Sequence, residues 1–505
     1  MTQLWNCSGR RATLAYEVIQ VSAPVEYQKV DDTYFEKRQL RRHARVWSLW
    51  ALGVGAVISG DFFGWNFGLA AGGFGGLLLA TLIMTAMYTG LCFSIAEMSP
   101  ALPHAGGAYS FARSAMGPWG GYVTGLAENM EYVLTPAVIV VAIGSYLGQI
   151  FGTGDEWQPL WWLGTYALFI GLNVYGVALS FRFTVVITLA ALGILLVFYV
   201  GAIPHLDFSR YAWTVPADTG HSVFLPKGIP GIFAALPFAM WFYLAIEELP
   251  LAAEEAHDPV VDMPKGILFG LLTLVVCALL TLVISVGIAP GALVLSASEE
   301  PLFEGFRTIF GEGLGSRLLA LVAVSGLVAS FHTIIFAYGR QIFSLSRAGY
   351  FPRILSLTHS TQKTPHVALV VGGVLGYLVA FVIHRLGSGH PVGAVLLNMA
   401  VFGAVISYVL QMLSFILLRL RAPHLPRPYK SPLGMAGAGF ALLVSLITLI
   451  TLFVVDPVYR QVAVGATLWF VLGLAYFALV GRHQLVRSPE ESLAVELISS
   501  NKPKS

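Results

Sequence analysis

The chain has 505 residues, of which 56% are hydrophobic and 11% charged, and its formal net charge is +2 at pH 7. A soluble globular chain carries roughly 25% charged residues, so the composition excludes an ordinary soluble domain and predicts a protein embedded in a lipid bilayer. The near-neutral charge shows no basic excess for nucleic acid, and three widely spaced cysteines (Cys7, Cys92 and Cys277) predict neither a disulfide framework nor a metal site.

The apolar segments predict an all-α membrane protein with twelve transmembrane helices. A helix needs about 20 apolar residues to cross the ~30 Å of hydrocarbon in a bilayer. Segments that meet this requirement lie near 46–70, 75–98, 118–150, 159–179, 182–204, 228–255, 263–288, 315–348, 365–385, 391–420, 434–455 and 460–480. The polar residues before them lack the apolar core and cleavage site of a secretory signal peptide.

The distribution of basic residues predicts the orientation of these helices. With twelve spans, 23 of the 29 Lys and Arg residues fall in the tails and loops on the side of the N-terminus, and six fall on the other side. Cytoplasmic loops carry the excess of Lys and Arg, so both termini are expected in the cytoplasm.

The first and sixth predicted spans contain residues that interrupt helices. The first carries five glycines between Gly53 and Gly68, and the sixth carries Gly228, Pro230, Gly231 and Pro237. Interrupted spans at corresponding positions five helices apart favour a five-plus-five inverted repeat with discontinuous helices, although small residues also serve close helix packing. The predicted division is a tail (1–45), helices 1–5 (46–204), an extracytoplasmic loop (205–227), helices 6–10 (228–420), helices 11–12 (434–480) and a tail (481–505).

Each interrupted span also carries acidic residues. An Asp at the middle of an isolated span costs roughly 2.5–3.5 kcal/mol, so it is retained where it faces a cavity, a partner or a ligand. Asp61 has no basic residue in its own span, and Glu247 and Glu248 lie some way from Lys265. These acids predict a cation-binding pocket near the middle of the membrane. Capping of the second half of helix 1 is the alternative role for Asp61.

Four motifs resemble the amino acid-polyamine-organocation transporters. EMSPALPHAGGAY begins at Glu97, EEAHDPVVDMP at Glu254, RQIFSLSRAGYFP at Arg340 and PRPYKSP at Pro426. Their order and spacing are similar to those of that superfamily from about residue 46 to 480, and the run from 47 to 76 looks closest to bacterial ethanolamine permeases. The resemblance implies the leucine-transporter-like fold, transport by alternating access, a location in the cytoplasmic (inner) membrane of a bacterium, and no enzymatic activity or cofactor. No sequence motif favours the rival class, a membrane-embedded enzyme or receptor.

The first span departs from the amino acid carriers that it resembles. In those carriers a turn of small residues offers bare amides to the substrate carboxylate, whereas this spacing places Gly64, Trp65 and Asn66 there. A bulky Trp crowds a carboxylate, and Asp61 repels one. We therefore expect a small amine without a carboxylate, such as ethanolamine, with its ammonium held by Asp61. An amino acid or polyamine is the alternative substrate.

Further polar and aromatic residues complete the expected site. Trp241, Phe242 and Tyr243, together with Trp65 and Glu247, are expected to enclose the cation, and plain core packing is the alternative for each aromatic ring. Gating or proton coupling is expected to involve Glu128, Glu131, Glu248 and His332, although a lone histidine in such a span more often serves packing.

The coupling ion is left open as a proton, a sodium ion or none. The lysine that replaces sodium in some relatives corresponds to Ala191, and a sodium site would draw on Ser325, Ser330 and Thr333. Glu97, Glu254 and Glu255 are expected to form pairs with Arg113, Arg340 and Arg347 at the cytoplasmic ends of the helices.

Overall fold

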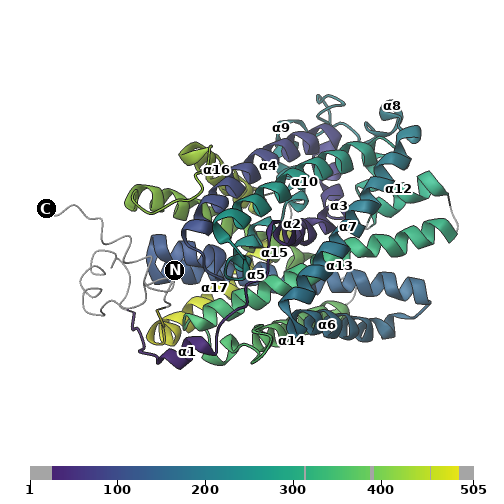
Figure 1. Cartoon of the computed structure of the whole chain (residues 1–505). Helices are drawn as coiled ribbons and strands as arrows, with labels where there is room; N and C mark the ends of the chain where they lie inside the picture. The colour runs from purple at the N-terminus through teal and green to yellow at the C-terminus, as the bar shows by residue number, and fades with distance from the viewer. Residues whose placement is uncertain (1–24, 299, 312–313, 387–391, 455–456, 488–505) are drawn as a thin grey trace.

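The computed structural model describes residues 25–298, 300–311, 314–386, 392–454 and 457–487. Within these residues the chain forms a bundle of helices with no β-sheet, and two isolated bridges join Tyr27 to Leu485 and Ala44 to Ala256 (Figure 1). The prediction of an all-α protein is confirmed for this part of the chain. The α-helices are α1 (Asp32–Glu36), α2 (Val46–Val57), α3 (Ser59–Phe62), α4 (Gly68–Ala101), α5 (Gly107–Phe151), α6 (Gln158–Tyr175), α7 (Val177–Ala202), α8 (Phe208–Tyr211), α9 (Gly228–Ala239), α10 (Pro259–Val286), α11 (Ala292–Leu295), α12 (Pro301–Phe310), α13 (Leu314–Arg347), α14 (His366–Leu386), α15 (Val392–Arg421), α16 (Gly434–Val454) and α17 (Pro457–Leu479).

A helix lies at each of the twelve predicted spans, but the spans differ in length. Among the described residues, nine helical segments are long and apolar enough to cross a membrane, and Val46–Phe62 is a shorter apolar helix. The helices α6 and α13 fall outside that set of nine. The chain is therefore a multi-pass membrane protein, while the count of twelve and the inverted repeat stay predictions.

The first predicted span is interrupted after α3. Phe63 is extended (φ −160°, ψ 169°) and Gly64 has φ 93°, a conformation that favours glycine, before the short 3₁₀ helix η2 (Trp65–Phe67) begins. The helix resumes as α4 at Gly68. This interruption agrees with the glycine pattern of the sequence.

The sixth predicted span is interrupted between two 3₁₀ segments, η5 (Met240–Phe242) and η6 (Ile246–Glu255). Ala245 lies between them in the left-handed region with φ 84°. The two interruptions touch, because a Cβ added to Gly60 would overlap the carbonyl oxygen of Trp241. Glycine at position 60 therefore allows α3 to approach η5 at backbone distance.

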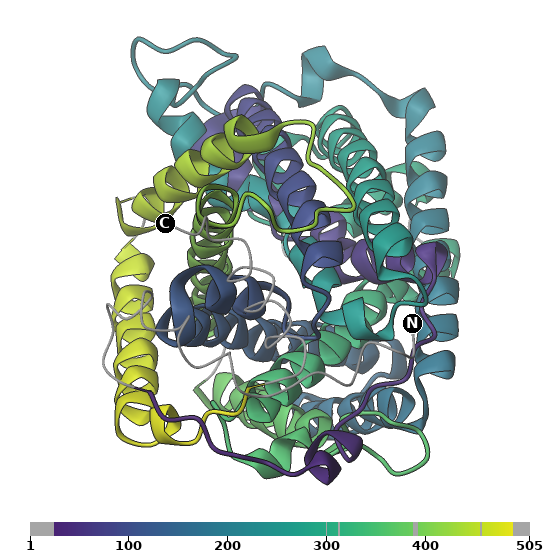
Figure 2. The same cartoon turned by 60° about the vertical axis from the view of Figure 1, so that its left-hand side comes forward.

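The helices around these interruptions form the centre of the bundle. The long helix α5 packs against α13 and α15, while α4 packs against α9 and α10. Figure 2 shows α16 and α17, drawn in yellow-green and yellow, along the edge of the bundle. Exposed apolar side chains such as Leu468, Leu472 and Leu479 suit this edge to lipid.

The segment before α2 fastens one end of the bundle. Its backbone bonds to Leu485 and Glu255, and the Tyr34 hydroxyl donates a 2.9 Å hydrogen bond to the carbonyl oxygen of Arg347. Burial raises the pKa of Tyr34 above its ordinary value, against the opposing effect of Arg38, so the hydroxyl keeps the proton that it donates. This segment thus joins three distant parts of the chain, near Glu255, Arg347 and Leu485, at one end of the bundle.

Candidate functional site

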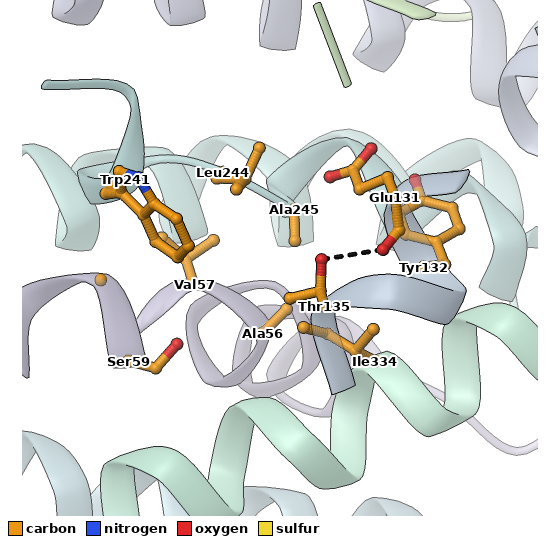
Figure 3. A pocket seen from close by; sticks show the side chains of 11 residues that line it. Ala56, Val57, Ser59, Glu131, Tyr132, Thr135, Trp241, Leu244, Ala245 and Ile334 are labelled. Carbon is orange, nitrogen blue, oxygen red and sulfur yellow. Dashed lines mark hydrogen bonds between the residues drawn. The ribbon is translucent and has the colours of Figure 1, made fainter. Parts of the chain in front are cut away.

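A small enclosed cavity lies where the two interrupted spans meet. It is lined by residues of α2, α3, α5, η5 and α13 and by the turn before η6, including Ser59, Gly60, Glu131, Trp241 and Ala245 (Figure 3). Its volume of about 10 Å³ holds about one water molecule. The structure is therefore a closed state, and a larger solute needs these elements to move apart.

Glu131 is the acidic residue in the lining of this cavity. Its side chain projects from α5 toward the turn at Leu244 and Ala245 in Figure 3. The residue is 1% exposed, and neither carboxylate oxygen accepts a hydrogen bond from an N–H or hydroxyl group of the described residues. A buried carboxylate without a donor is costly, so this group is suited to a proton or to a cation that enters the cavity.

Three more glutamates surround Glu131 and form with it a group that we call the central glutamates. Glu128 accepts a 2.7 Å hydrogen bond from Nε2 of Gln341. Glu247 lies beside Glu131 and the Tyr408 hydroxyl, and Glu248 has no partner in the described part of the chain. All four are buried, and none of them forms an ion pair with a described Lys, Arg or His. The four glutamates that the sequence singled out, Glu128, Glu131, Glu247 and Glu248, thus lie together in one acidic region.

Asp61 lies next to the cavity, one residue beyond Gly60, but it is not part of the lining. The residue is 1% exposed, its Oδ1 accepts a 3.0 Å hydrogen bond from the Thr281 hydroxyl of α10, and its Oδ2 has no partner among the described residues. No backbone amide in the described segments bonds to this carboxylate. The capping alternative is therefore wrong in this state, and the role of Asp61 toward an ammonium stays a prediction.

Gly64, Trp65 and Asn66 lie outside the cavity lining. The Asn66 amide donates to the carbonyl oxygens of Leu295 (2.7 Å) and Ser298 (2.8 Å). Its Oδ1 accepts a 3.1 Å bond from the Gly64 amide. Asn66 therefore connects the interruption of the first span to α11 and to the loop after it. Its amide nitrogen and its amide oxygen both already form hydrogen bonds.

The predicted aromatic residues point in different directions. Trp241 lines the cavity and packs against Phe63 with ring centroids 5.8 Å apart. Phe242 stacks on Trp65 at 5.6 Å, and the Tyr243 hydroxyl lies 2.6 Å from that of Thr85. Packing thus accounts for Trp65, Phe242 and Tyr243 in this closed state, and Trp241 is the one of these four rings that lines the cavity.

His332 lies in a polar niche away from the cavity. One ring nitrogen is 3.2 Å from the Asn173 amide and the other is 3.1 Å from the Ser180 hydroxyl, with Phe183 packed against the ring. Both nitrogens therefore have partners, as expected of a packing residue.

Two amides of the first interrupted span already have side-chain partners. The Ser330 hydroxyl accepts a 3.1 Å bond from the Ser59 amide and donates a 2.9 Å bond to the Gly55 carbonyl. The Gly64 amide is bonded to Asn66. These two amides are therefore not free to receive a carboxylate in this state.

Sequence reasoning missed Ser59, Gly60, Ala245 and Thr281. The glycine before Asp61 was a usable signal, because close backbone approach favours glycine. Ala245 gave no signal, since a left-handed alanine cannot be foreseen from its residue type. Thr281 lies 220 positions from Asp61, so only the packing of α10 brings the two together.

A second acidic group differs sharply from the central glutamates, and we call it the acid–arginine cluster. Glu255 pairs with Arg340 (2.7 Å), Glu254 pairs with Arg347, and Glu97 pairs with Arg419 (2.5 Å) and Arg427 (3.1 Å). The expected pairs of Glu254 and Glu255 are confirmed. Glu97 was expected among Arg113, Arg340 and Arg347, which is wrong, because the last turn of α15 and the loop after it supply its partners.

Comparisons with known proteins place this geometry in context. The sequence model of the family described as "Amino acid permease" matches residues 45–479. An uncharacterized transporter of Rhizobium meliloti is 31% identical over 76% of this chain and 81% of its own length. A branched-chain amino acid permease and a methylthioribose transporter, both of Bacillus subtilis, are 25% and 23% identical, covering 88% and 89% of this chain and 94% and 96% of their own lengths.

Proposed function

Because the chain belongs to the amino acid permease family, we propose that it is a secondary transporter that carries a small amine such as ethanolamine. The proposed route is alternating access, in which helices 1–5 and 6–10 move as two related halves around the cavity. The proposed location is a bacterial inner membrane with both termini in the cytoplasm.

The observation that carries this proposal is the unpartnered carboxylate of Glu131 in the cavity lining. An ion pair at 4 Å is worth about 4 kcal/mol at an effective dielectric constant of 20, before the cost of desolvation. An ammonium group would supply the missing donors and the missing positive charge together. Trp241 would add a cation–π attraction of about 0.5–2 kcal/mol.

Asp61 is the second proposed carboxylate for the ammonium. Asp61 follows Gly60, which lines the cavity, and its Oδ2 has no partner among the described residues. If α3 separates from η5, this carboxylate would face the cavity. Substituting Glu131 and Asp61 one at a time can show which of the two carboxylates holds the ammonium.

The partners of the Ser59 and Gly64 amides support a substrate without a carboxylate. An amino acid would need donors for its carboxylate, and the acids around the cavity would repel that group. With four heavy atoms, ethanolamine binds at best with about −6 kcal/mol, or a dissociation constant of roughly tens of micromolar. The site would therefore select by charge and size.

Amino acid transport is the second candidate, and the printed function of the Bacillus branched-chain amino acid permease favours it. The methylthioribose transporter among the relatives shows that similarity at this level does not fix the substrate. Polyamines form a third group to be separated by experiment.

A competition assay on the purified protein tests the proposal. Ethanolamine, serine, choline and putrescine would be compared as competitors in binding and in uptake by proteoliposomes. We expect ethanolamine to compete best, choline to be limited by its bulky nitrogen and putrescine by its length. Preferred binding of serine would replace the amine proposal with the amino acid one.

Variants assign the roles of the two acids. Glu131→Gln is expected to weaken ethanolamine binding by about 10- to 100-fold, which corresponds to loss of one charged hydrogen bond. Asp61→Asn is expected to do the same if Asp61 reaches the ammonium, and unchanged affinity would limit it to packing against Thr281. Glu304→Gln, on the half-exposed helix α12, is the control and should bind normally.

A further inference from the structure

Glu131 and Glu247 lie against each other across two different elements. Glu131 belongs to α5 and Glu247 to η6, the second part of the interrupted span. Their carboxylates are close enough for a hydrogen bond between them, and the other donors in the pair's surroundings, the Tyr408 hydroxyl and the amides of Ala245 and Glu247, lie beside Glu247. Two carboxylates offer only acceptors, so such a bond requires a proton on one of them.

The surroundings of the pair contain no described counter-charge. The titratable groups that face it are acids, tyrosines and a cysteine from α4, α5, η6 and α15, namely Glu128, Glu248, Tyr88, Tyr132, Tyr408 and Cys92. The Tyr88 and Tyr408 hydroxyls lie 3.1 Å apart. A second carboxylate charge at this place would be opposed by Glu128 and Glu248 and balanced by nothing nearby.

Like charges in close contact and out of water do not both ionise, so one proton shared by a carboxylate pair is the stable arrangement. A cation delivered to the cavity, which Glu131 lines, changes this balance. The ammonium supplies a positive charge and hydrogen-bond donors. The shared proton supplies the same two things, as one positive charge and one O–H donor.

We propose that Glu131 and Glu247 hold one proton between them when the cavity is empty and that an entering ammonium displaces this proton, so the transporter exchanges amine for protons. This inference rests on the proposed amine substrate. The step breaks one O–H bond of a carboxylic acid, and the proton passes to water on the side to which the cavity is open. When the amine leaves on the other side, water returns a proton to the pair.

The position of the pair explains why exchange would be obligatory. Two ionised carboxylates would repel α5 and η6 from each other, whereas a proton or an ammonium between them allows these elements to close. The closed state, in which the cavity is about 10 Å³, is thus accessible to the protonated carrier and to the amine-loaded carrier. An empty and fully ionised carrier would be held open, which prevents leakage in either direction.

Infrared spectroscopy of the purified full-length protein tests the shared proton directly. The amine-free protein at neutral pH is expected to show the carbonyl stretch of a protonated carboxylic acid, assigned by its loss in Glu247→Gln and in Glu131→Gln. The control Glu304→Gln, on α12 and outside the central glutamates, is expected to keep it. Added ethanolamine should remove the band and release about one proton per bound amine into weakly buffered solution.

The outcomes separate this inference from the proposed function. Amine binding with an unchanged band, or without proton release, would overturn the exchange and leave amine transport standing. Failure of every tested amine to bind would overturn the proposed substrate and, with it, amine-for-proton exchange. A band that is absent from the amine-free protein, or that survives both Glu247→Gln and Glu131→Gln, would overturn the shared proton whatever the substrate is.

Discussion

The central glutamates and the acid–arginine cluster are two buried acidic regions of one protein with opposite surroundings. In the cluster, Glu97, Glu254 and Glu255 each form an ion pair with arginine. Among the central glutamates, Glu128 is bonded to an uncharged amide, and the other three have no basic partner among the described residues. The two regions are therefore alike in burial and differ in counter-charge, and the proposed function assigns ligand binding to the region that lacks one.

The difference in counter-charge agrees with the roles proposed for the two regions, structural for the cluster and ligand-binding for the central glutamates. The paired acids join α4 to α15 and η6 to α13, so they hold segments together whatever occupies the cavity. The central acids leave their charge uncompensated, which costs stability unless a proton or cation is present. Substitutions in the two regions should therefore change stability in opposite directions.

The largest effect is expected from Glu255→Met. Both partners of the Glu255–Arg340 pair are fully buried, and loss of one partner of such a pair costs about 3–5 kcal/mol because the other charge is left alone. Thermal unfolding of the purified protein should show a marked loss of stability. The double variant with Arg340→Met should recover most of it, and a double variant as unstable as the single one would contradict this explanation.

An effect of opposite sign is expected from Glu248→Met. This change replaces a buried carboxyl without a described partner by an apolar side chain of similar length, and removal of an unsatisfied polar group gains about 1–3 kcal/mol. The same unfolding assay measures it beside Glu255→Met. A loss of stability at both positions would mean that Glu248 has a structural partner and belongs with the paired acids.

The smallest effect is expected from Lys227→Met at the surface. The pair of Lys227 with Asp218 (2.6 Å) is partly exposed, and water screens such pairs to less than about 1 kcal/mol. Unfolding should therefore barely change. A loss as large as that of Glu255→Met would show that the counter-charge matters regardless of burial, which would remove the basis of the comparison.

Much of the fold could be predicted from local properties of the sequence. Apolar runs of the required length predicted helices at all twelve positions, since a helix is the simplest way to satisfy backbone groups in lipid. Glycine predicted the interruption near Gly64. The sixth span is also interrupted, but between η5 and η6, whereas the predicted breakers Gly231 and Pro237 lie within α9. The four motifs predicted the superfamily, which the match over residues 45–479 confirms.

The site was predicted less completely, because it depends on directions that residue types do not reveal. Glu131 was expected in gating or proton coupling and lines the cavity. Asn66 was expected to meet the substrate, and in this closed state its amide bonds to Leu295 and Ser298, so its role toward a substrate stays a prediction. Trp65 and Phe242 were expected around a cation and stack on each other. In each case a contact from a distant segment decided the outcome.

The sequence by itself determined that this chain is a helical membrane protein, that two of its spans are broken, and that acids are present within them. These properties depend on composition and on neighbours along the chain. Only the tertiary structure decided which acids are neutralised, because Arg340 reaches Glu255 and no described cation reaches Glu131. Charge compensation acts over a few ångströms through space, and the residues that provide or withhold it lie far apart in the sequence.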